Sequence, residues 1–218
     1  MIELKNVSKE YEGGVKALNR VSLKFTEGEV VVLKGMSGSG KSSILSLIAG
    51  LCKPTEGEVV VDGKHISKLA DHFATSFRRE NIGMIFQKYN LIVDLSVQEN
   101  ILLPLVPLNL KNDELEKRLN RELERSNLVS KKDIQVKKLS GGEQQRCAIA
   151  RANSNNPKII LADEPTANLD EKLSLEFIAS LCEMKRENRT IIIATHDPLF
   201  FDLDFVDRIV EVGYGKIV

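Results

Sequence analysis

Residues 35–42 have the types and spacing that suit phosphate binding. They are Gly-Met-Ser-Gly-Ser-Gly-Lys-Ser and match the pattern G-x-x-x-x-G-K-S/T. Glycines let backbone amides approach a polyphosphate closely, and the free amides at a helix N-terminus attract anions. In this pattern the lysine reaches the β- and γ-phosphates and the final hydroxyl can ligate Mg²⁺. We therefore expect a nucleotide phosphate site formed by Gly35, Met36, Ser37, Gly38, Ser39, Gly40, Lys41 and Ser42, with Ser43 following in the first helical turn.

Two apolar segments would have to position this loop. Glu29–Leu33 is a β-branched run of the length of a buried strand, and Ser42–Ala49 carries apolar residues at helical spacing. A preceding strand and a following helix distinguish a phosphate-binding loop from an ordinary glycine-rich turn. The context therefore favours phosphate binding in an α/β protein.

Two acidic residues, Asp163 and Glu164, follow a second predicted strand that begins at Lys158. Acidic side chains at the end of a strand can simply be solvated. In proteins with a phosphate loop, however, a carboxylate at this position holds Mg²⁺. We expect Asp163 to support the metal and Glu164 to orient or deprotonate a water molecule.

Two further polar residues lie just beyond predicted strands. Gln87 follows the strand at 81–86, and His196 lies shortly after the strand at 190–194. Ligands of open α/β sheets gather at the carboxyl ends of the strands. Gln87 and His196 could therefore face the same nucleotide as Glu164.

A second glycine-rich element lies at 139–146. Ser140 and Glu143 have the spacing of a capping box, so the segment could simply start a helix. Gly141 and Gly142, however, each weaken a helix by about 1 kcal/mol relative to alanine. That cost is understandable if something approaches the backbone closely, and an anion at the helix N-terminus is a candidate.

The N-terminal 25 residues show short alternating apolar patterns interrupted by Gly13-Gly14, which predicts a small antiparallel β-region. Tyr11 lies just before this glycine pair. It is either an ordinary strand aromatic or a stacking platform for a base. Farther on, Asp62-Gly63 is typical of a hairpin turn.

Residues 91–138 show no strand pattern and indicate a helical lobe. Ser96 is expected to cap a helix that ends near Pro104, because Glu99 completes a capping box. Asn112 could cap a second helix, in which the leucines at 115, 119 and 123 share one face.

Composition limits the possible partners. Lysine and arginine together number 31, as do aspartate and glutamate, so no net positive charge favours nucleic acid. The longest apolar runs are far shorter than the roughly 20 residues of a membrane-spanning helix. Cys52, Cys147 and Cys182 are odd in number and scattered, which indicates free thiols rather than disulfides or a metal cluster.

Taken together, these segments occur in the order and spacing of the ATP-binding cassette (ABC) ATPases, and the whole chain resembles one nucleotide-binding subunit. The Leu-Ser-Gly-Gly-Glu element at 139–143 distinguishes this family from other P-loop ATPases. The resemblance implies an α/β fold with a P-loop (RecA-like) core, an antiparallel β-subdomain and an inserted helical subdomain. The core and β-subdomain would take residues 1–90 and 158–218, and the helical subdomain residues 91–157.

The resemblance also implies a role for each candidate residue. Tyr11 would stack on adenine, Lys41 and Ser42 would hold phosphates and Mg²⁺, and Asp163 would support the metal. Gln87 would line the metal and the water, Glu164 would be the catalytic base, and His196 would contact the γ-phosphate. The resemblance further implies that two chains sandwich two MgATP molecules, each chain reaching its partner's ATP through Ser140, Gly141 and Gly142.

Within the family, the segments 78–87, 90–91 and 162–170 resemble the lipoprotein-release, macrolide- or peptide-export and cell-division group. Ser43, Asn153 and Ala167 depart from that pattern. We expect an ATPase that drives a separately encoded transmembrane permease from the cytoplasmic face of the inner (plasma) membrane. The permease would export or release a lipoprotein, a peptide or a drug-like molecule.

Two alternatives share the same site residues. One is a division or envelope-remodelling factor that uses ATP as a switch and moves no cargo. The other is a DNA-repair or chromosome-organising ABC ATPase. Residues 43–138 leave no room for the long coiled coil that many such proteins insert, and the balanced charge gives no nucleic-acid footprint.

Overall fold

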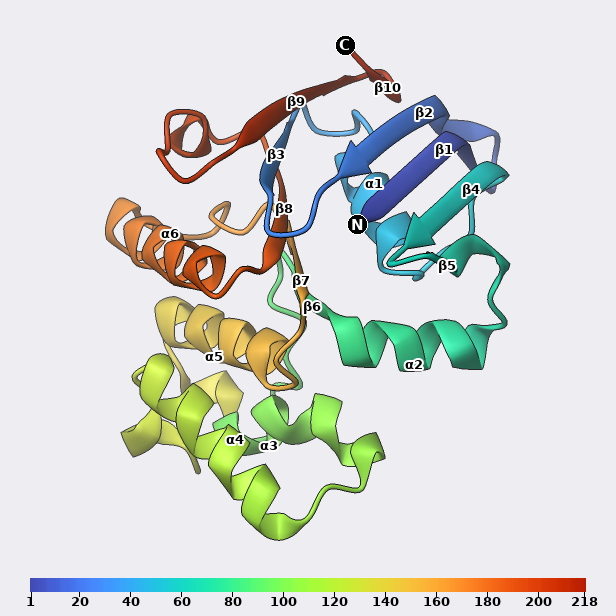
Figure 1. Ribbon diagram of the computed structural model, residues 1–218. Coiled ribbons are helices and arrows are strands. Elements are labelled where there is room, and N and C mark those ends of the chain that lie inside the picture. The colour runs from blue at the N-terminus through green and yellow to red at the C-terminus, as the bar shows by residue number, and fades with distance from the viewer.

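The computed structural model describes residues 1–218, and its centre is a six-stranded sheet (Figure 1). The strand order is β10-β9-β3-β8-β7-β6, with the five strands from β9 to β6 parallel and β10 antiparallel at the edge. This arrangement confirms the predicted α/β fold class. The strands are β3 (Val30–Lys34), β6 (Ile82–Ile85), β7 (Ile159–Asp163), β8 (Thr190–Thr195), β9 (Arg208–Gly213) and β10 (Lys216–Ile217).

The central strands are buried on both faces, which explains their continuous apolar sequences. In β3, Val31 and Leu33 face the cluster that contains α1 (Lys41–Ile48), whereas Val30 and Val32 face the opposite cluster. The opposite cluster is built on α6 (Glu171–Arg186) and α5 (Gly141–Asn153). The sheet is thus held between two apolar layers that fix the ends of its strands.

A second, antiparallel sheet covers α1 (Figure 1). Its order is β2-β1-β4-β5, formed by β1 (Ile2–Tyr11), β2 (Val15–Phe25), β4 (Glu56–Val61) and β5 (Lys64–His65). The predicted antiparallel region and hairpin turn are confirmed, since Asp62 and Gly63 adopt φ of 47° and 76° between paired strands. Tyr11 ends the first strand of this sheet, next to the turn into β2.

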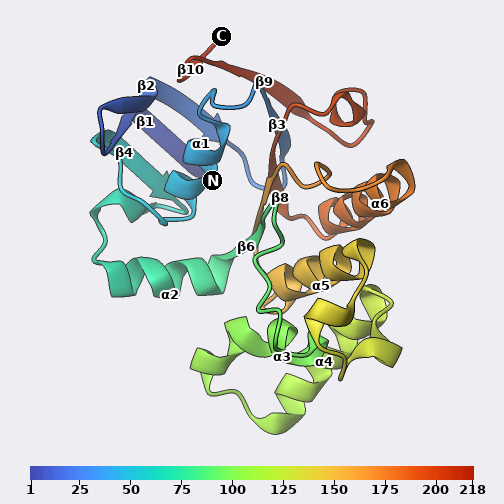
Figure 2. The same cartoon turned by 180° about the vertical axis from the view of Figure 1, so that it is seen from behind.

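The elements from 97 to 153 are all helical and lie at one end of the molecule, away from the antiparallel sheet (Figures 1 and 2). They include α3 (Val97–Leu102), α4 (Asn112–Arg125) and α5, which share a third apolar cluster. The Ser96–Glu99 capping box is present, as predicted. The boundaries of the helical subdomain at 91–157 stay a prediction.

One helix prediction differs from the structure, and one helix was not predicted. Asn112 is the first residue of α4 rather than its cap; Lys111 takes the cap position and forms no side-chain capping bond. The acidic residues Asp113 and Glu114 in the first turn complement the helix dipole instead. The helix α2 (Asp71–Asn81) was not predicted. Phe73, Ala74 and Phe77 have helical spacing, but polar and charged residues dominate the segment and only Ala74 and Phe77 are buried.

No helix of this structure has the length and apolar character that crossing a bilayer requires. The three cysteines carry free thiols, as the sequence indicated. Cys147 is buried in the helical region, and burial raises the pKa of its thiol to about 12.

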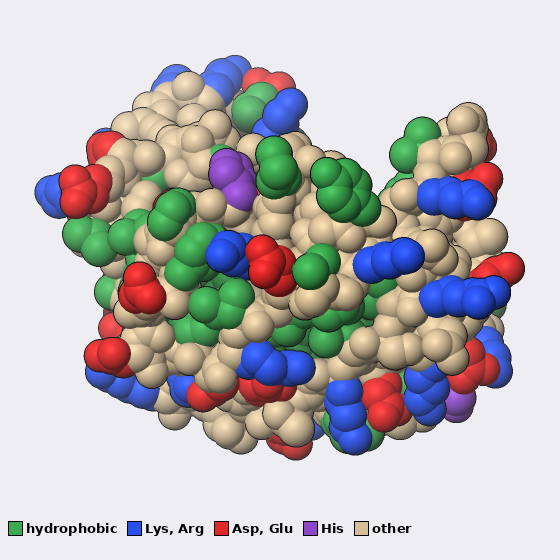
Figure 3. All heavy atoms as spheres, turned by 90° about the horizontal axis from the view of Figure 1, so that it is seen from above, with side chains coloured by type: hydrophobic (Ala, Val, Ile, Leu, Met, Phe, Trp, Pro, Cys, Tyr) green, Lys and Arg blue, Asp and Glu red, His purple; other side chains and the backbone are tan.

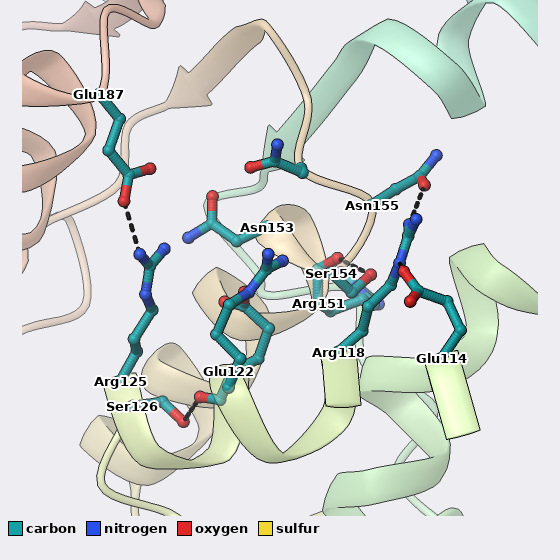
Figure 4. Close-up of polar contacts among 12 residues, drawn as sticks. Glu114, Arg118, Glu122, Arg125, Ser126, Arg151, Asn153, Ser154, Asn155 and Glu187 are labelled. Atoms are coloured by element: carbon teal, nitrogen blue, oxygen red, sulfur yellow. Dashed lines mark hydrogen bonds and ion pairs between the residues drawn. The ribbon is translucent and has the colours of Figure 1, made fainter. Parts of the chain in front are cut away.

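A buried arginine connects the helical region to the central sheet. Arg189 precedes β8, is 4% exposed, and donates hydrogen bonds to Asn153 Oδ1 (2.8 Å) and Asn156 Oδ1 (3.0 Å). It also pairs with Glu187 at 2.7 Å. Glu187 in turn pairs with Arg125 of α4 at 2.6 Å (Figure 4). Asn153 thus supplies a buried acceptor to this guanidinium.

Replacing Arg189 with alanine is expected to lower the free energy of unfolding by about 2–4 kcal/mol, because Asn153 loses its buried donor and Glu187 loses a cation. Chemical denaturation measures the effect. Arg186→Ala is the control, since Arg186 is exposed at the end of α6 and should cost less than about 0.5 kcal/mol. Equal losses of unfolding free energy in the two variants would contradict a structural role for the contacts of Arg189.

Candidate active site

The loop between β3 and α1 depends on glycine at two positions. Gly40 has φ of 109°, and a Cβ there would lie 2.6 Å from the carbonyl oxygen of Ala17. At Gly35 an added Cβ would lie 2.2 Å from the carbonyl oxygen of Val212. The α1 N-terminus carries no side-chain cap and no acidic residue in its first turn, so its amides are free to meet an anion.

Lys41 points back into this loop. Its side chain is 4% exposed, and Nζ donates to the carbonyl oxygens of Gly35 (2.6 Å) and Met36 (3.0 Å). Nζ also lies 3.3 Å from Glu164 Oε1. The predicted phosphate-binding lysine and the predicted catalytic acid therefore form an ion pair in which the lysine is buried and the acid is partly buried.

Glu164 and His196 meet because two parallel strands end side by side. In the register of β7 and β8, Asp163 lies opposite Ala194. Glu164 follows at φ of 43°, and its amide donates to the Ala194 carbonyl at 2.8 Å. The His196 ring nitrogen Nδ1 then lies 3.0 Å from both carboxylate oxygens of Glu164.

The electrostatics of Glu164 favour its ionised form. Burial alone would raise the pKa of this carboxyl, but the hydrogen bond with His196 and the charge of Lys41 outweigh burial and lower the pKa below its ordinary value. The residue therefore carries a negative charge at neutral pH, which it needs in order to accept a proton from water.

Ser42 and Asp163 form an oxygen pair that suits a hard cation. Ser42 Oγ donates to Asp163 Oδ1 at 2.8 Å. Burial is the main cause that raises the pKa of Asp163, and the charge of Glu164 adds to it, against the bond from Ser42 and the charge of Lys41. A divalent cation beside this carboxylate would favour its ionised form. No cluster of three or more His, Cys, Asp or Glu side chains surrounds the pair, so further ligands would come from nucleotide, water or an amide side chain.

Tyr11 and Gln87 lie near this centre by different routes. The Tyr11 hydroxyl is 3.3 Å from Ser43 Oγ on α1, so β1 brings the exposed ring beside the phosphate loop. Gln87 is exposed beyond the end of β6, and its backbone carbonyl accepts a hydrogen bond from the Asn168 side-chain amide at 2.9 Å. The side chain of Gln87 forms no hydrogen bond with Ser42 or Asp163.

The glycine-rich start of α5 lies apart from the phosphate loop of the same chain (Figure 1). Ser140 and Glu143 form the predicted capping box. A Cβ at Gly142 would lie 2.7 Å from Leu173, so side-chain packing explains that glycine without an anion. At Gly141 the nearest atom is 3.9 Å away, and both Ser140 and Gly141 are exposed.

A cavity of about 520 Å³ lies against the phosphate loop. Part of its lining was not predicted as functional from the sequence, because Phe201, Glu211 and Tyr214 belong to segments without a motif. Met36 and Tyr214 are 82% and 99% exposed. Seen from above, hydrophobic side chains gather over the middle of the molecule, and its outline is notched between two raised parts (Figure 3).

Sequence reasoning also missed Thr195, the last residue of β8. Its hydroxyl donates to Glu164 Oε2 at 3.1 Å. The only signal in the sequence is a polar residue that ends a buried apolar strand. That position is compatible with solvation, so the pattern alone does not indicate a partner.

Comparison with known proteins gives a consistent set of relatives. The family described as ABC transporter matches residues 18–167. The macrolide export ATP-binding/permease protein MacB 1 of Yersinia pestis is 38% identical over 221 residues, covering 100% of this chain and 34% of the relative. MacB of Salmonella typhi is 39% identical with the same coverage of 100% and 34%. The chain therefore spans about a third of the length of these curated relatives.

Solved structures show the same similarity. A dimeric, post-hydrolysis state of the ATP-binding cassette MJ0796 bound to ADP and Pi is 40% identical, with a TM-score of 0.91 and coverage of 100% of this chain and 96% of that one. CbiO1 of Clostridium perfringens, part of the transporter complex CbiONQ, is 31% identical, with a TM-score of 0.86 and coverage of 100% and 86%.

Proposed function

The chain belongs to the ABC transporter family, whose ATP-binding domains hydrolyse ATP, and from this premise we propose that two copies close around two MgATP and drive a transmembrane permease. The observation that carries the proposal is the meeting of Lys41, Glu164 and His196 at the ends of β7 and β8 beside the phosphate loop.

Each side chain of the centre has a role in the proposed reaction. The amides of Gly35–Ser43 and the ammonium of Lys41 bind the phosphates and absorb negative charge that develops in the transition state. Glu164 orients the attacking water and accepts its proton, and His196 contacts the γ-phosphate. Lys41 can neutralise either Glu164 or the γ-phosphate, so a bound nucleotide competes with the carboxylate for this lysine.

We propose that Ser42 and Asp163 hold Mg²⁺, with Gln87 approaching the metal and the water from the end of β6. The oxygen donors of this pair fit that ion. When bound, Mg²⁺ neutralises phosphate charge and helps to orient the triphosphate. Tyr11 stacks on the adenine, which its position beside Ser43 permits.

A second copy would complete the site. Ser140 and Gly141 are exposed, and the α5 helix that they begin lies apart from the phosphate loop of its own chain, so they can serve the loop of a partner (Figure 1). The exposed Met36 places an apolar side chain on the face that such a partner would cover. The cassette MJ0796 is dimeric in its solved structures, which supports this arrangement.

The permease would dock near the segment that carries Gln87. A groove of about 390 Å³ lies between α2, β6 and the 3-10 helix after α3, and its lining includes Arg79, Phe86, Leu103 and Pro104. CbiO1 is part of a transporter complex, and the MacB relatives are named ATP-binding/permease proteins. We propose export or release of a drug-like molecule, peptide or lipoprotein, with the chain held at the cytoplasmic face of the membrane by its permease.

The dimer can be tested by light scattering and by the concentration dependence of hydrolysis. The protein carrying Glu164→Gln is expected to be dimeric with MgATP and monomeric with MgADP, because slow hydrolysis preserves the triphosphate. Wild-type turnover per chain should rise with protein concentration until dimers predominate. Adding Gly141→Asp, which fits the open space at that residue, should prevent dimerisation by placing a carboxylate near the partner's phosphates.

Gly141→Ala is the matched control, since it adds a neutral side chain at the same place and should allow more dimerisation than aspartate. A protein that stays monomeric with MgATP, and whose turnover per chain does not change with concentration, would contradict the proposed assembly.

A further inference from the structure

Thr195 holds the Glu164 carboxylate with a hydroxyl whose direction is fixed. The residue is fully buried at the end of β8, and its Oγ1 lies 3.1 Å from Glu164 Oε2. The Asp197 amide donates to the same hydroxyl at 3.0 Å. Because that amide fills one acceptor position, the single hydroxyl proton is left for the carboxylate.

The other side-chain partners of Glu164 are needed elsewhere during the proposed reaction. Lys41, 3.3 Å from the carboxylate, and His196, 3.0 Å from it, are both assigned to phosphate. The His196 side chain is 62% exposed and can turn toward a ligand. When nucleotide attracts both side chains, Thr195 is the side-chain donor that remains on the carboxylate, beside the backbone amide of His196 at 3.4 Å.

The backbone alone would not fix the carboxylate. The amide of Glu164 is tied to Ala194, which holds the start of the side chain, but the bonds beyond Cα stay free to rotate. The segments that follow β7 and β8 are also joined by a hydrogen bond, which Thr166 Oγ1 donates to Asp197 Oδ2 at 2.7 Å. This brace between the two segments does not involve Glu164. Within the segment 195–197, the Thr195 hydroxyl donates to the Glu164 carboxylate at 3.1 Å, and the His196 backbone amide lies at a longer 3.4 Å from the same oxygen.

We propose that Thr195 is a positioning residue for ATP hydrolysis, which keeps the Glu164 carboxylate aimed at the attacking water after Lys41 and His196 turn to the γ-phosphate. The inference rests on the proposed role of Glu164. It assigns to Thr195 no contact with nucleotide, and therefore no part in ATP affinity.

Thr195→Val is the informative variant, because valine has nearly the same shape and lacks the hydroxyl. We expect kcat to fall about 10- to 100-fold, as for a reacting group displaced by about 1 Å, with KM for ATP and the Kd of a non-hydrolysable ATP analogue within about 3-fold of wild type. Thr195→Ser restores the donor and should keep kcat within about 3-fold of wild type.

Thr166→Val is the matched control, since it removes a buried threonine hydroxyl from the same brace without touching Glu164. We expect it to lower kcat much less than Thr195→Val does. Thermal unfolding of each variant separates loss of fold from loss of positioning. An equal loss of kcat in both valine variants would mean that loosening of the loops, rather than the Thr195 hydroxyl, causes the effect, and would overturn the inference.

A double-mutant cycle distinguishes this inference from the proposed function. In single-turnover reactions, Thr195→Val should change the residual rate of Glu164→Gln by less than about 3-fold, because the carboxylate that it positions is gone. A full additional loss in that background, or a loss of kcat in Thr195→Ser equal to that in Thr195→Val, would overturn the role of Thr195. If wild type does not hydrolyse ATP, or Glu164→Gln hydrolyses it at the wild-type rate, the proposed function itself fails.

Discussion

Glu164→Gln is expected to lower ATP turnover by about 10²- to 10⁴-fold, the usual contribution of a positioned general base. Glutamine has almost the same shape but cannot accept the proton of the attacking water. Nucleotide binding should be unchanged or tighter, because the charge that pairs with Lys41 at 3.3 Å is removed and the ammonium becomes fully available to phosphate. Phosphate release measures turnover, and calorimetry with a non-hydrolysable analogue measures binding.

The control for this prediction is Glu171→Gln, at an exposed position in the first turn of α6. It should leave turnover within about 2-fold of wild type. Turnover by Glu164→Gln at the wild-type rate would remove the catalytic base from the proposed mechanism, whatever the affinity for ATP.

Lys41→Ala should act mainly on nucleotide binding. The ammonium is buried and has no substitute in the loop, so its loss should weaken ATP binding by about 30- to 5000-fold, corresponding to roughly 2–5 kcal/mol for one partner of a buried charge pair. Hydrolysis should fall as well, because charge on the transferring phosphoryl group is no longer stabilised. Titration with a fluorescent ATP analogue measures the affinity.

Lys34→Ala provides the comparison for Lys41, since Lys34 lines the same cavity at the end of β3 and stacks over Phe201 instead of entering the loop. Its effect on ATP affinity should stay below about 5-fold. ATP binding by Lys41→Ala with wild-type affinity would show that the glycine-rich loop is not the phosphate site.

Most of the fold was predictable because the central strands are continuous apolar runs that end in polar residues. The strands before Lys41, Glu164 and His196 were each recognised, and parallel pairing then brings their ends together. The distances among these side chains were not predictable. The Lys41–Glu164 ion pair depends on the backbone angle of Glu164, for which the sequence carries no signal.

The parts that sequence reasoning missed are those determined by tertiary packing. The helix α2 is mostly polar and buries only Ala74 and Phe77, so its short apolar pattern does not stand out in the sequence. Gly142 is required by the side chain of Leu173, a contact between residues far apart in the sequence, although a ligand seemed the natural reason for a glycine there. Thr195 resembles any polar strand end until its Glu164 partner is seen.

The Asn153–Arg189 contact makes two distant positions of the chain dependent on each other. The hydrogen bond joins residues separated by 36 positions. An apolar residue at position 153 would remove one acceptor of the buried Arg189 guanidinium and leave it Asn156 and Glu187. The effects of substitutions at 153 and 189 on stability should therefore not add: an apolar residue at 153 should cost less when residue 189 is apolar as well.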